Sequence, residues 1–221
     1  FAVDFGCKFE GESEYEPTYI RPNNDLDSLK QASYVMYEDT MKVSATHGDS
    51  TAIIDKPYFN RTLEHFCSHL HTPPSGEKYS DAVVMTKNTA YFANKVFEEY
   101  FKRGSIYTKE IVRAAIEALI GGNKSIKTNL PAQGVVTLTE NGDSQIVHTL
   151  YASPVRRGDN VEIIEDIVPI YNTSVSLKTD RTPKSVTLVP ENEPLEFVYK
   201  NGRVDFIVPE IDCWQMTEIK Y

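Results

Sequence analysis

The chain has 221 residues, of which 40% are hydrophobic and 25% charged, the usual composition of a globular protein. Its formal net charge of −9 argues against nucleic acid and anionic membranes as principal partners. No apolar run approaches the roughly 18 residues that a membrane-spanning helix needs. Three widely spaced cysteines, Cys7, Cys67 and Cys213, do not form a disulfide framework, so we expect reduced, buried thiols. The sequence leaves the cellular location open, with the cytoplasm favoured over secretion.

The first part of the chain is predicted to hold short extended segments. Residues 1–22, 33–43 and 51–54 are rich in aromatic and β-branched residues and are separated by Gly, Pro and acidic turn residues. Residues 23–31 are polar and suggest a helical turn. Residues 81–94 predict a hairpin that turns at Lys87-Asn88.

Two helices follow these strands. The first helix is predicted from an apolar stripe at helical spacing, which consists of Val96, Phe97, Tyr100 and Phe101. This helix is expected to end at Gly104. The second has the same periodicity in Ile111, Val112, Ala115, Ile116 and Leu119. Thr108 is a suitable N-cap for the second helix, and Gly121-Gly122 is a suitable stop.

Residues 124–221 show no helical periodicity and predict about eight short strands, which favours an antiparallel β-sandwich. Asn201-Gly202 is the strongest hairpin signal, because both residues accept the positive φ angles of a type I′ turn. Val161–Val168 is expected as one of the strands, and both His148 and Trp214 are expected in the core. The predicted domains are therefore residues 1–123 and 124–221.

Residues 58–75 contain the densest group of side chains that could bind a metal or act in catalysis. Its members, at a spacing of two residues, are His65, Cys67, His69 and His71. On an extended strand these four side chains would share one face. Such residues lie in a line, about 6 to 7 Å apart, and a line does not surround a metal ion. Cys67 also lacks the small neighbours of a nucleophile elbow. The geometry thus counts against a metal site and a thiol enzyme, although both remain alternatives.

Several phrases of the sequence resemble a known group of proteins. They are Pro57–Thr62, His65–His69 with Thr72-Pro73-Pro74, Ala90–Ala93, His148–Pro154 and Ile164–Pro169. The first part resembles the trimerisation domain of family-42 β-galactosidases, a flavodoxin-like, class I glutamine amidotransferase-like α/β domain. The closer resemblance is to bacterial glycoside hydrolases of the same layout that include α-L-fucosidases.

The resemblance implies a fold of two classes, an incomplete flavodoxin-like α/β domain at 1–123 and an all-β sandwich at 124–221. It implies that Phe1 lies inside the first domain and that the catalytic (β/α)8 barrel, with its paired carboxylates, is absent from this chain. The expected function is a non-catalytic accessory and oligomerisation region of a glycoside hydrolase. Whether the chain is itself an enzyme is uncertain. We expect no catalytic residue, no metal and no cofactor in it.

The resemblance also implies a role for the histidine-rich segment, as a stiff loop that contacts a neighbouring subunit or lines its substrate pocket. Its polar contacts would be Arg61, Glu64, His65, His69 and His71. The expected partners are further copies of the chain, as a trimer or dimer, or the missing barrel, and carbohydrate is also conceivable. The other interpretations are a stand-alone carbohydrate-binding module, a thiol or metal enzyme, and histidines that merely satisfy backbone carbonyls.

Overall fold

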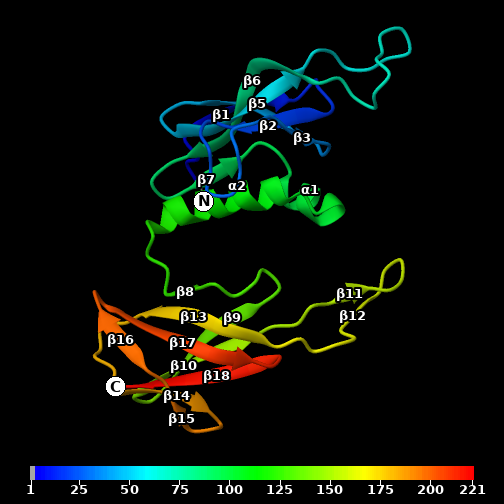
Figure 1. The fold of residues 1–221 in the computed structure, drawn as a ribbon. Helices are drawn as coiled ribbons and strands as arrows, with labels where there is room; N and C mark the ends of the chain where they lie inside the picture. The colour runs from blue at the N-terminus through cyan, green and yellow to red at the C-terminus, as the bar shows by residue number, and fades with distance from the viewer. Residues whose placement is uncertain (1–2) are drawn as a thin grey trace. The chain divides into compact units, whose positions relative to one another are not determined.

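The chain divides into two compact units, Phe1–Gly122 and Asn123–Tyr221. The computed structural model describes residues 3–221 of it, so the expected placement of Phe1 lies outside the described residues. Within residues 3–221 the structure is mostly β, with two helices in the first unit (Figure 1). Neither helix is both long and apolar enough to cross a bilayer.

The first unit is built from two antiparallel sheets. Its strands are β1 (Cys7–Glu12), β2 (Thr18–Pro22), β3 (Tyr34–Met36), β4 (Met41–Ala45), β5 (Asp49–Pro57), β6 (Pro74–Met85) and β7 (Ala90–Phe92). The five-stranded sheet has the order β3-β2-β5-β6-β7, and β1 pairs with β4 in a separate ribbon. The predicted hairpin at Lys87-Asn88 joins β6 to β7 and is confirmed. Residues 23–31 hold an isolated bridge, Leu26 to Leu29, in place of the expected helical turn.

These sheets correct one part of the fold expectation. A flavodoxin-like domain is built on a parallel sheet, whereas every strand pair described in the first unit is antiparallel. The physical reason lies in the connections, because parallel neighbours need a long crossover, usually a helix. Here both helices follow β7 at the end of the unit, and no helix connects one strand of the sheet to the next.

The two helices are α1 (Val96–Arg103) and α2 (Ile106–Ile120). The predicted stops at Gly104 and Gly121 are confirmed, since both residues adopt the left-handed conformation that ends a helix. The predicted N-cap of α2 is wrong, because Ser105 occupies the N-cap position, although its side chain makes no capping hydrogen bond. Thr108 lies inside the first turn, where its hydroxyl donates to the carbonyl of Ser105 at 2.6 Å.

The face that α1 buries differs from the predicted apolar stripe. Val96 and Glu99 are buried, whereas Phe97 and Phe101 are 72% and 89% exposed. The Glu99 carboxylate accepts the backbone N–H groups of Tyr37 at 2.8 Å and Glu38 at 3.1 Å. These two bonds hold the acidic face of α1 against the segment that follows β3.

The core of the first unit lies between the five-stranded sheet and the helices. Its buried members are Ile20, Met36, Ala52, Ile54, Ala82, Val83, Val96 and Ile111. They come from β2, β3, β5, β6, α1 and α2, so one apolar cluster joins the five-stranded sheet to both helices.

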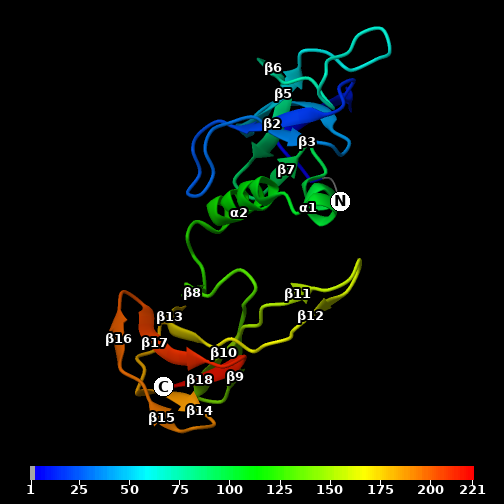
Figure 2. The ribbon, with the colours of Figure 1, turned by 45° about the vertical axis from the view of Figure 1, so that its right-hand side comes forward.

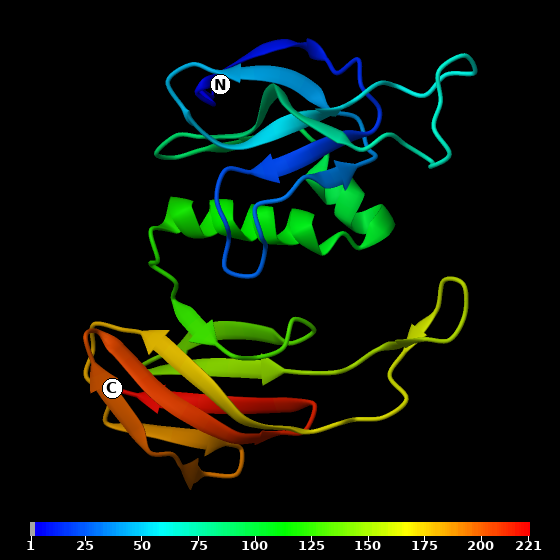
Figure 3. The ribbon, with the colours of Figure 1, turned by 45° about the horizontal axis from the view of Figure 1, so that its top comes forward.

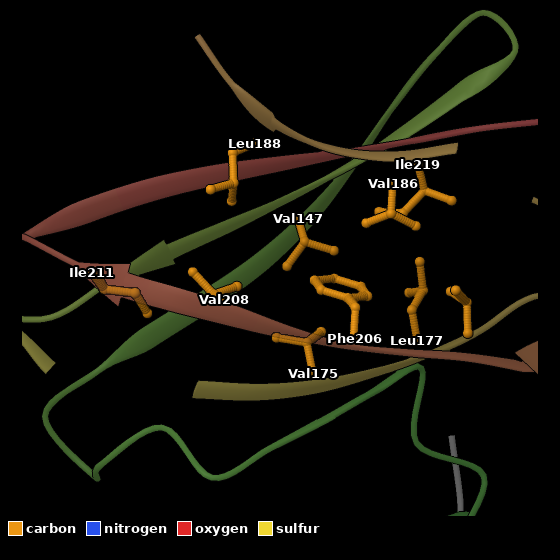
Figure 4. Close-up of a cluster of buried hydrophobic side chains, with 10 residues drawn as sticks. Val147, Val175, Leu177, Val186, Leu188, Phe206, Val208, Ile211 and Ile219 are labelled. Carbon is orange, nitrogen blue, oxygen red and sulfur yellow. The ribbon is translucent and has the colours of Figure 1, made fainter. Parts of the chain in front are cut away.

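The second unit contains two main antiparallel sheets. One has the order β15-β14-β18-β10-β9 and the other β16-β17-β13-β8. The bounds are β8 (Ile126–Thr128), β9 (Val135–Asn141), β10 (Ser144–Leu150), β11 (Val155–Arg156), β12 (Glu162–Ile163), β13 (Ile170–Lys178), β14 (Ser185–Val189), β15 (Glu193–Pro194), β16 (Phe197–Lys200), β17 (Arg203–Ile211) and β18 (Trp214–Lys220). Figure 4 shows side chains of both sheets meeting in one core, with Val147 and Ile219 from one sheet and Val175, Leu177 and Phe206 from the other.

The predicted turn between β16 and β17 is confirmed, with φ angles of 55° at Asn201 and 69° at Gly202. The predicted strand Val161–Val168 is largely wrong. Only Glu162–Ile163 pairs, with Val155–Arg156, and the rest of this arm is exposed (Figure 3). Its apolar residues find no strand partner within the described chain.

Two predicted core residues also lie elsewhere. His148 is half-buried and faces outward, with its Nε2 atom 3.2 Å from the Thr139 hydroxyl, because Val147 and Thr149 take the inward positions on β10. Trp214 opens β18 and is 42% exposed. The three cysteines are free and partly exposed, so the expectation of buried thiols is wrong.

Candidate functional site

The histidine-rich segment forms the loop Tyr58–Pro73 between β5 and β6, referred to below as the β5–β6 loop. It projects beyond the sheet in all three ribbon views (Figures 1, 2 and 3). The segment is therefore a loop and not an extended strand, so its four His and Cys side chains do not share the single face that a strand would give them. Pro57 and Pro74 border the loop and Pro73 is its last residue, and none of the three can donate the ladder hydrogen bonds that would extend β5 and β6 through it.

The base of the loop is fastened to the first unit. Tyr58 N–H donates to the Pro73 carbonyl at 3.2 Å, and the buried Thr72 hydroxyl donates to the Phe59 carbonyl at 2.8 Å. The Tyr19 hydroxyl donates to the Thr72 carbonyl from the strand below. Any tyrosine keeps its phenol proton at neutral pH. Burial raises the pKa of Tyr19 to about 12, so this phenol remains a donor in alkaline solution as well.

Two predicted site residues hold the shape of the loop. Arg61 Nη1 donates to the Leu70 carbonyl at 2.6 Å and so joins the two limbs of the loop. Thr62 N–H donates to the His65 carbonyl at 2.8 Å, and the His65 ring stacks on Phe59 at a centroid distance of 3.6 Å. The loop thus has an internal structure that does not depend on a sheet.

The remaining predicted residues lie apart from one another. The His71 ring packs edge-on against Tyr37 at 5.5 Å, and its Nδ1 atom is buried without a hydrogen-bond partner in the described chain. Glu64 and His69 are exposed. Neither of their side chains makes a hydrogen bond or ion pair with any other residue in 3–221.

The chemistry that metal or thiol catalysis would need is not assembled in the loop. Among residues 3–221, no three His, Cys, Asp or Glu side chains lie where they could hold one metal ion. The Cys67 thiol lies 3.5 Å from the backbone carbonyl of His69, and no imidazole accepts its proton among the described contacts. This geometry offers no base for a nucleophilic thiolate.

The structure adds a feature of the loop that we did not predict from the sequence. Three large apolar side chains stand in solvent at its outer part, Leu63 at 94%, Phe66 at 67% and Leu70 at 77% exposure. The sequence contains a signal for them, because large apolar residues at positions 63, 66 and 70 lie in a segment that has no strand or helix pattern to bury them. Large apolar side chains that are exposed in one short loop are the observation on which a proposal for its role can be based.

Comparisons with known proteins relate the chain to solved structures. No family model and no curated protein matches the sequence. Among solved structures, α-L-fucosidase isoenzyme 2 from Paenibacillus thiaminolyticus is 39% identical and matches 99% of this chain with a TM-score of 0.93. The match occupies 34% of that protein, so the chain spans about a third of its length.

A β-galactosidase from Bacillus circulans sp. alkalophilus matches 97% of this chain and 24% of its own length, at 10% identity and a TM-score of 0.50. At that identity the likeness concerns the fold alone. The resemblance to the C-terminal region of such enzymes, noted from the sequence, is confirmed: the chain matches a C-terminal portion of an α-L-fucosidase, a glycoside hydrolase.

Proposed function

We propose that the chain is a non-catalytic accessory region of a glycoside hydrolase, and that the β5–β6 loop docks it onto the part of that hydrolase which the chain does not cover. The chain spans about a third of the fucosidase that it matches, which leaves a large body for the loop to contact in the same or a neighbouring subunit. In this proposal, paired carboxylates on that body cleave the glycosidic bond, an α-L-fucosidic bond by analogy with the fucosidase.

The observation that carries the proposal is the exposure of Leu63, Phe66 and Leu70 on a loop whose backbone is held in place. Burial of apolar surface contributes roughly 25 cal/mol per Å², so leaving these side chains in water forgoes a large stabilisation. The internal bonds of the loop lower the entropy that docking would cost, since its shape already exists.

The polar residues of the loop take two roles in this proposal. Glu64 and His69 are the contacts to the partner or to a sugar hydroxyl. Their side chains are exposed and make no hydrogen bond or ion pair with another residue of the described chain. Arg61 and His65 position the apolar tip through the Leu70 carbonyl and Phe59. His71 anchors the base against Tyr37.

A chimaeric enzyme tests the proposal. The matched portion of α-L-fucosidase isoenzyme 2 is replaced by this chain, and its sedimentation mass and fucosidase activity are compared with those of a variant carrying Leu63→Ser and Leu70→Ser. We expect the parent chimaera to be active and the variant to lose activity or assembly by about tenfold or more, because the docking surface has become polar. His69→Ala is expected to have a smaller effect in the same direction.

Val135→Ser serves as the matched control, because Val135 is also an exposed aliphatic residue and lies on β9 of the other unit. Thermal unfolding of the isolated chain should be unchanged in all of these variants. If the loop variant retains the mass and activity of the parent chimaera, docking through this loop is refuted. Equal destabilisation of the isolated chain would show that the loop residues are structural.

A further inference from the structure

The outer face of the four-stranded sheet in the second unit is hollowed along β13, one of its two central strands. This cavity has a volume of about 920 Å³ and is called the β13 groove below. The lining residues that matter to its chemistry are Lys127, Asn172, Ser174, Ser176, Asp205 and Ile207. A volume of this order is typical of sites for small organic ligands.

The groove arises from the side-chain sizes on β13. Val175 and Leu177 point into the core, so Ser174 and Ser176 point outward by strand alternation. The register places Ile207 beside Ser174, and Asp205 and Lys127 on the two sides of Ser176. Two small residues in the middle of a sheet thus form a floor between walls of longer side chains.

The floor offers side chains and not backbone groups to a ligand. Strand β13 pairs with β17 along most of its length and with β8 at residues 175–177, so around Ser176 its ladder hydrogen bonds are already made on both sides. The N–H group of Ser174 donates to Asn129 Oδ1 at 2.8 Å. An extended peptide could not add itself as a further strand at this part of β13. Recognition in the β13 groove therefore depends on hydroxyl, amide, carboxylate and ammonium groups.

Four of these polar groups are free to bind. The side chains of Lys127, Asn172, Ser174 and Asp205 make no hydrogen bond or ion pair with another residue in the described part of the chain, whereas the Ser176 hydroxyl accepts Arg203 Nε at 2.8 Å. Lys127 donates, Asp205 accepts, and the amide and hydroxyl do both. Closely spaced donors and acceptors of both kinds match vicinal hydroxyl groups.

The charge of the groove and its apolar wall further restrict the class of ligand that fits it. The cation Lys127 is balanced by Asp205 and Glu196 in the same lining, so a polyanion would gain little from the site. Ile207 and Val198 are 54% and 60% exposed at the groove and give an aliphatic surface for C–H groups. A sugar ring carries hydroxyls at its edge and C–H groups on its faces.

We propose that the β13 groove binds a neutral saccharide, with ring hydroxyls on Asp205, Asn172, Ser174 and Lys127 and a C–H face on Ile207. The site belongs to the second unit and goes beyond docking by the β5–β6 loop. Because the exposed apolar residues of the wall, Ile207 and Val198, are aliphatic and small, we expect weak binding, with a dissociation constant of the order of 1 mM.

Amide chemical shifts of the isotope-labelled 221-residue chain test this site. L-fucose, D-galactose and lactose are titrated separately to about 50 mM, well above a millimolar dissociation constant, with glycerol as a polyol that lacks a ring. We expect saturable shifts at Ser174, Ser176, Asp205 and Ile207 with at least one sugar and none with glycerol. The absence of saturable shifts with all three sugars, or the same shifts with glycerol, would overturn the proposal.

Variants separate the groove from other surfaces. Asp205→Ala should weaken binding by about tenfold or more, equivalent to about 1.4 kcal/mol, while Glu210→Ala, an exposed carboxylate on the same strand, should leave it unchanged. Ser174→Leu fills the floor and provides a second, independent loss. Binding that survives both Asp205→Ala and Ser174→Leu places the sugar elsewhere and contradicts the assignment. Leu63→Ser with Leu70→Ser should not change sugar binding, so this site and the docking function can fail separately.

Discussion

Glu99 shows how a single acidic residue sets the orientation of a helix. Its side chain is wholly buried, and one oxygen accepts the N–H groups of Tyr37 and Glu38 while Arg103 Nε lies 3.6 Å from the other. A buried carboxylate without partners would cost several kcal/mol. Here two backbone donors satisfy Oε2, whereas Oε1 is buried without a hydrogen bond in the described chain and has only the nearby Arg103 charge. Its fixed position turns Phe97 and Phe101 outward, against the preference of aromatic side chains for the interior.

Glu38 carries a pH-dependent part of the stability. Hydrogen bonds from Lys102 and then Arg103, on α1, lower the pKa of Glu38 from 4.5 to about 2. A lowered carboxylate pKa stabilises the folded state above the ordinary value, and that contribution disappears as the pH falls towards the folded value. Glu38→Gln should therefore lower the urea midpoint at neutral pH and flatten its decline between pH 4.5 and about 2.

The check is a series of urea unfolding curves across that pH range, with Glu64→Gln as control. Glu64 is exposed in the β5–β6 loop and has no described ion pair, so its variant should follow the wild-type curve. Identical pH profiles for Glu38→Gln and wild type would show that the ion pairs of Glu38 contribute nothing to folding.

At the scale of elements, the β16–β17 hairpin depends on one glycine. Gly202 has a φ of 69° and a Cβ there would meet only the Thr179 carbonyl at 3.6 Å, so the cost of Gly202→Ala is conformational rather than steric. We expect a loss of about 1 kcal/mol in the free energy of unfolding of the second unit. Gly158→Ala is the matched control, since its φ is not positive and its Cβ would meet only Val161. Equal urea midpoints for the two variants would contradict the assigned turn type.

Two segments extend beyond the main sheets because neither has a strand of those sheets to pair with: residues 161–168, where the sequence predicts a strand, and the β5–β6 loop. Residues 161–168 have strand-forming composition, yet residues 164–168 pair with no strand in the described chain. The arm is held instead by the ion pair between Arg157 and Glu165. The β5–β6 loop likewise leaves the sheet at Pro57. A strand needs a partner edge, which local sequence cannot supply.

At the scale of the whole molecule, the two units have separate cores. Leu177 is fully buried in the second core and Ile54 in the first. Leu177→Ala should cost about 2–5 kcal/mol and weaken hydrogen-exchange protection throughout the second unit, with the amides around Ile54 unaffected. Ile54→Ala provides the reciprocal measurement. Loss of protection in both units from either variant would show that the chain unfolds as one cooperative body.

Local chemistry in the sequence was sufficient for the strands of the hairpins, both helix ends at Gly104 and Gly121, the Asn201-Gly202 turn and the kinship with a region of glycoside hydrolases. These features depend on backbone conformation and on side-chain periodicity, which neighbouring residues determine. The choice of residues 58–75 as a candidate site also came from the sequence, and the role of that segment stays a prediction.

Only the tertiary structure decided which strands pair, which face of α1 is buried, and that His65, Cys67, His69 and His71 diverge along a loop. It also decided that two serines of β13 form the floor of a groove. All of these depend on contacts between residues far apart in the chain. Their free energies come from burial and from hydrogen bonds across elements, and no local pattern encodes which distant partner a residue will meet.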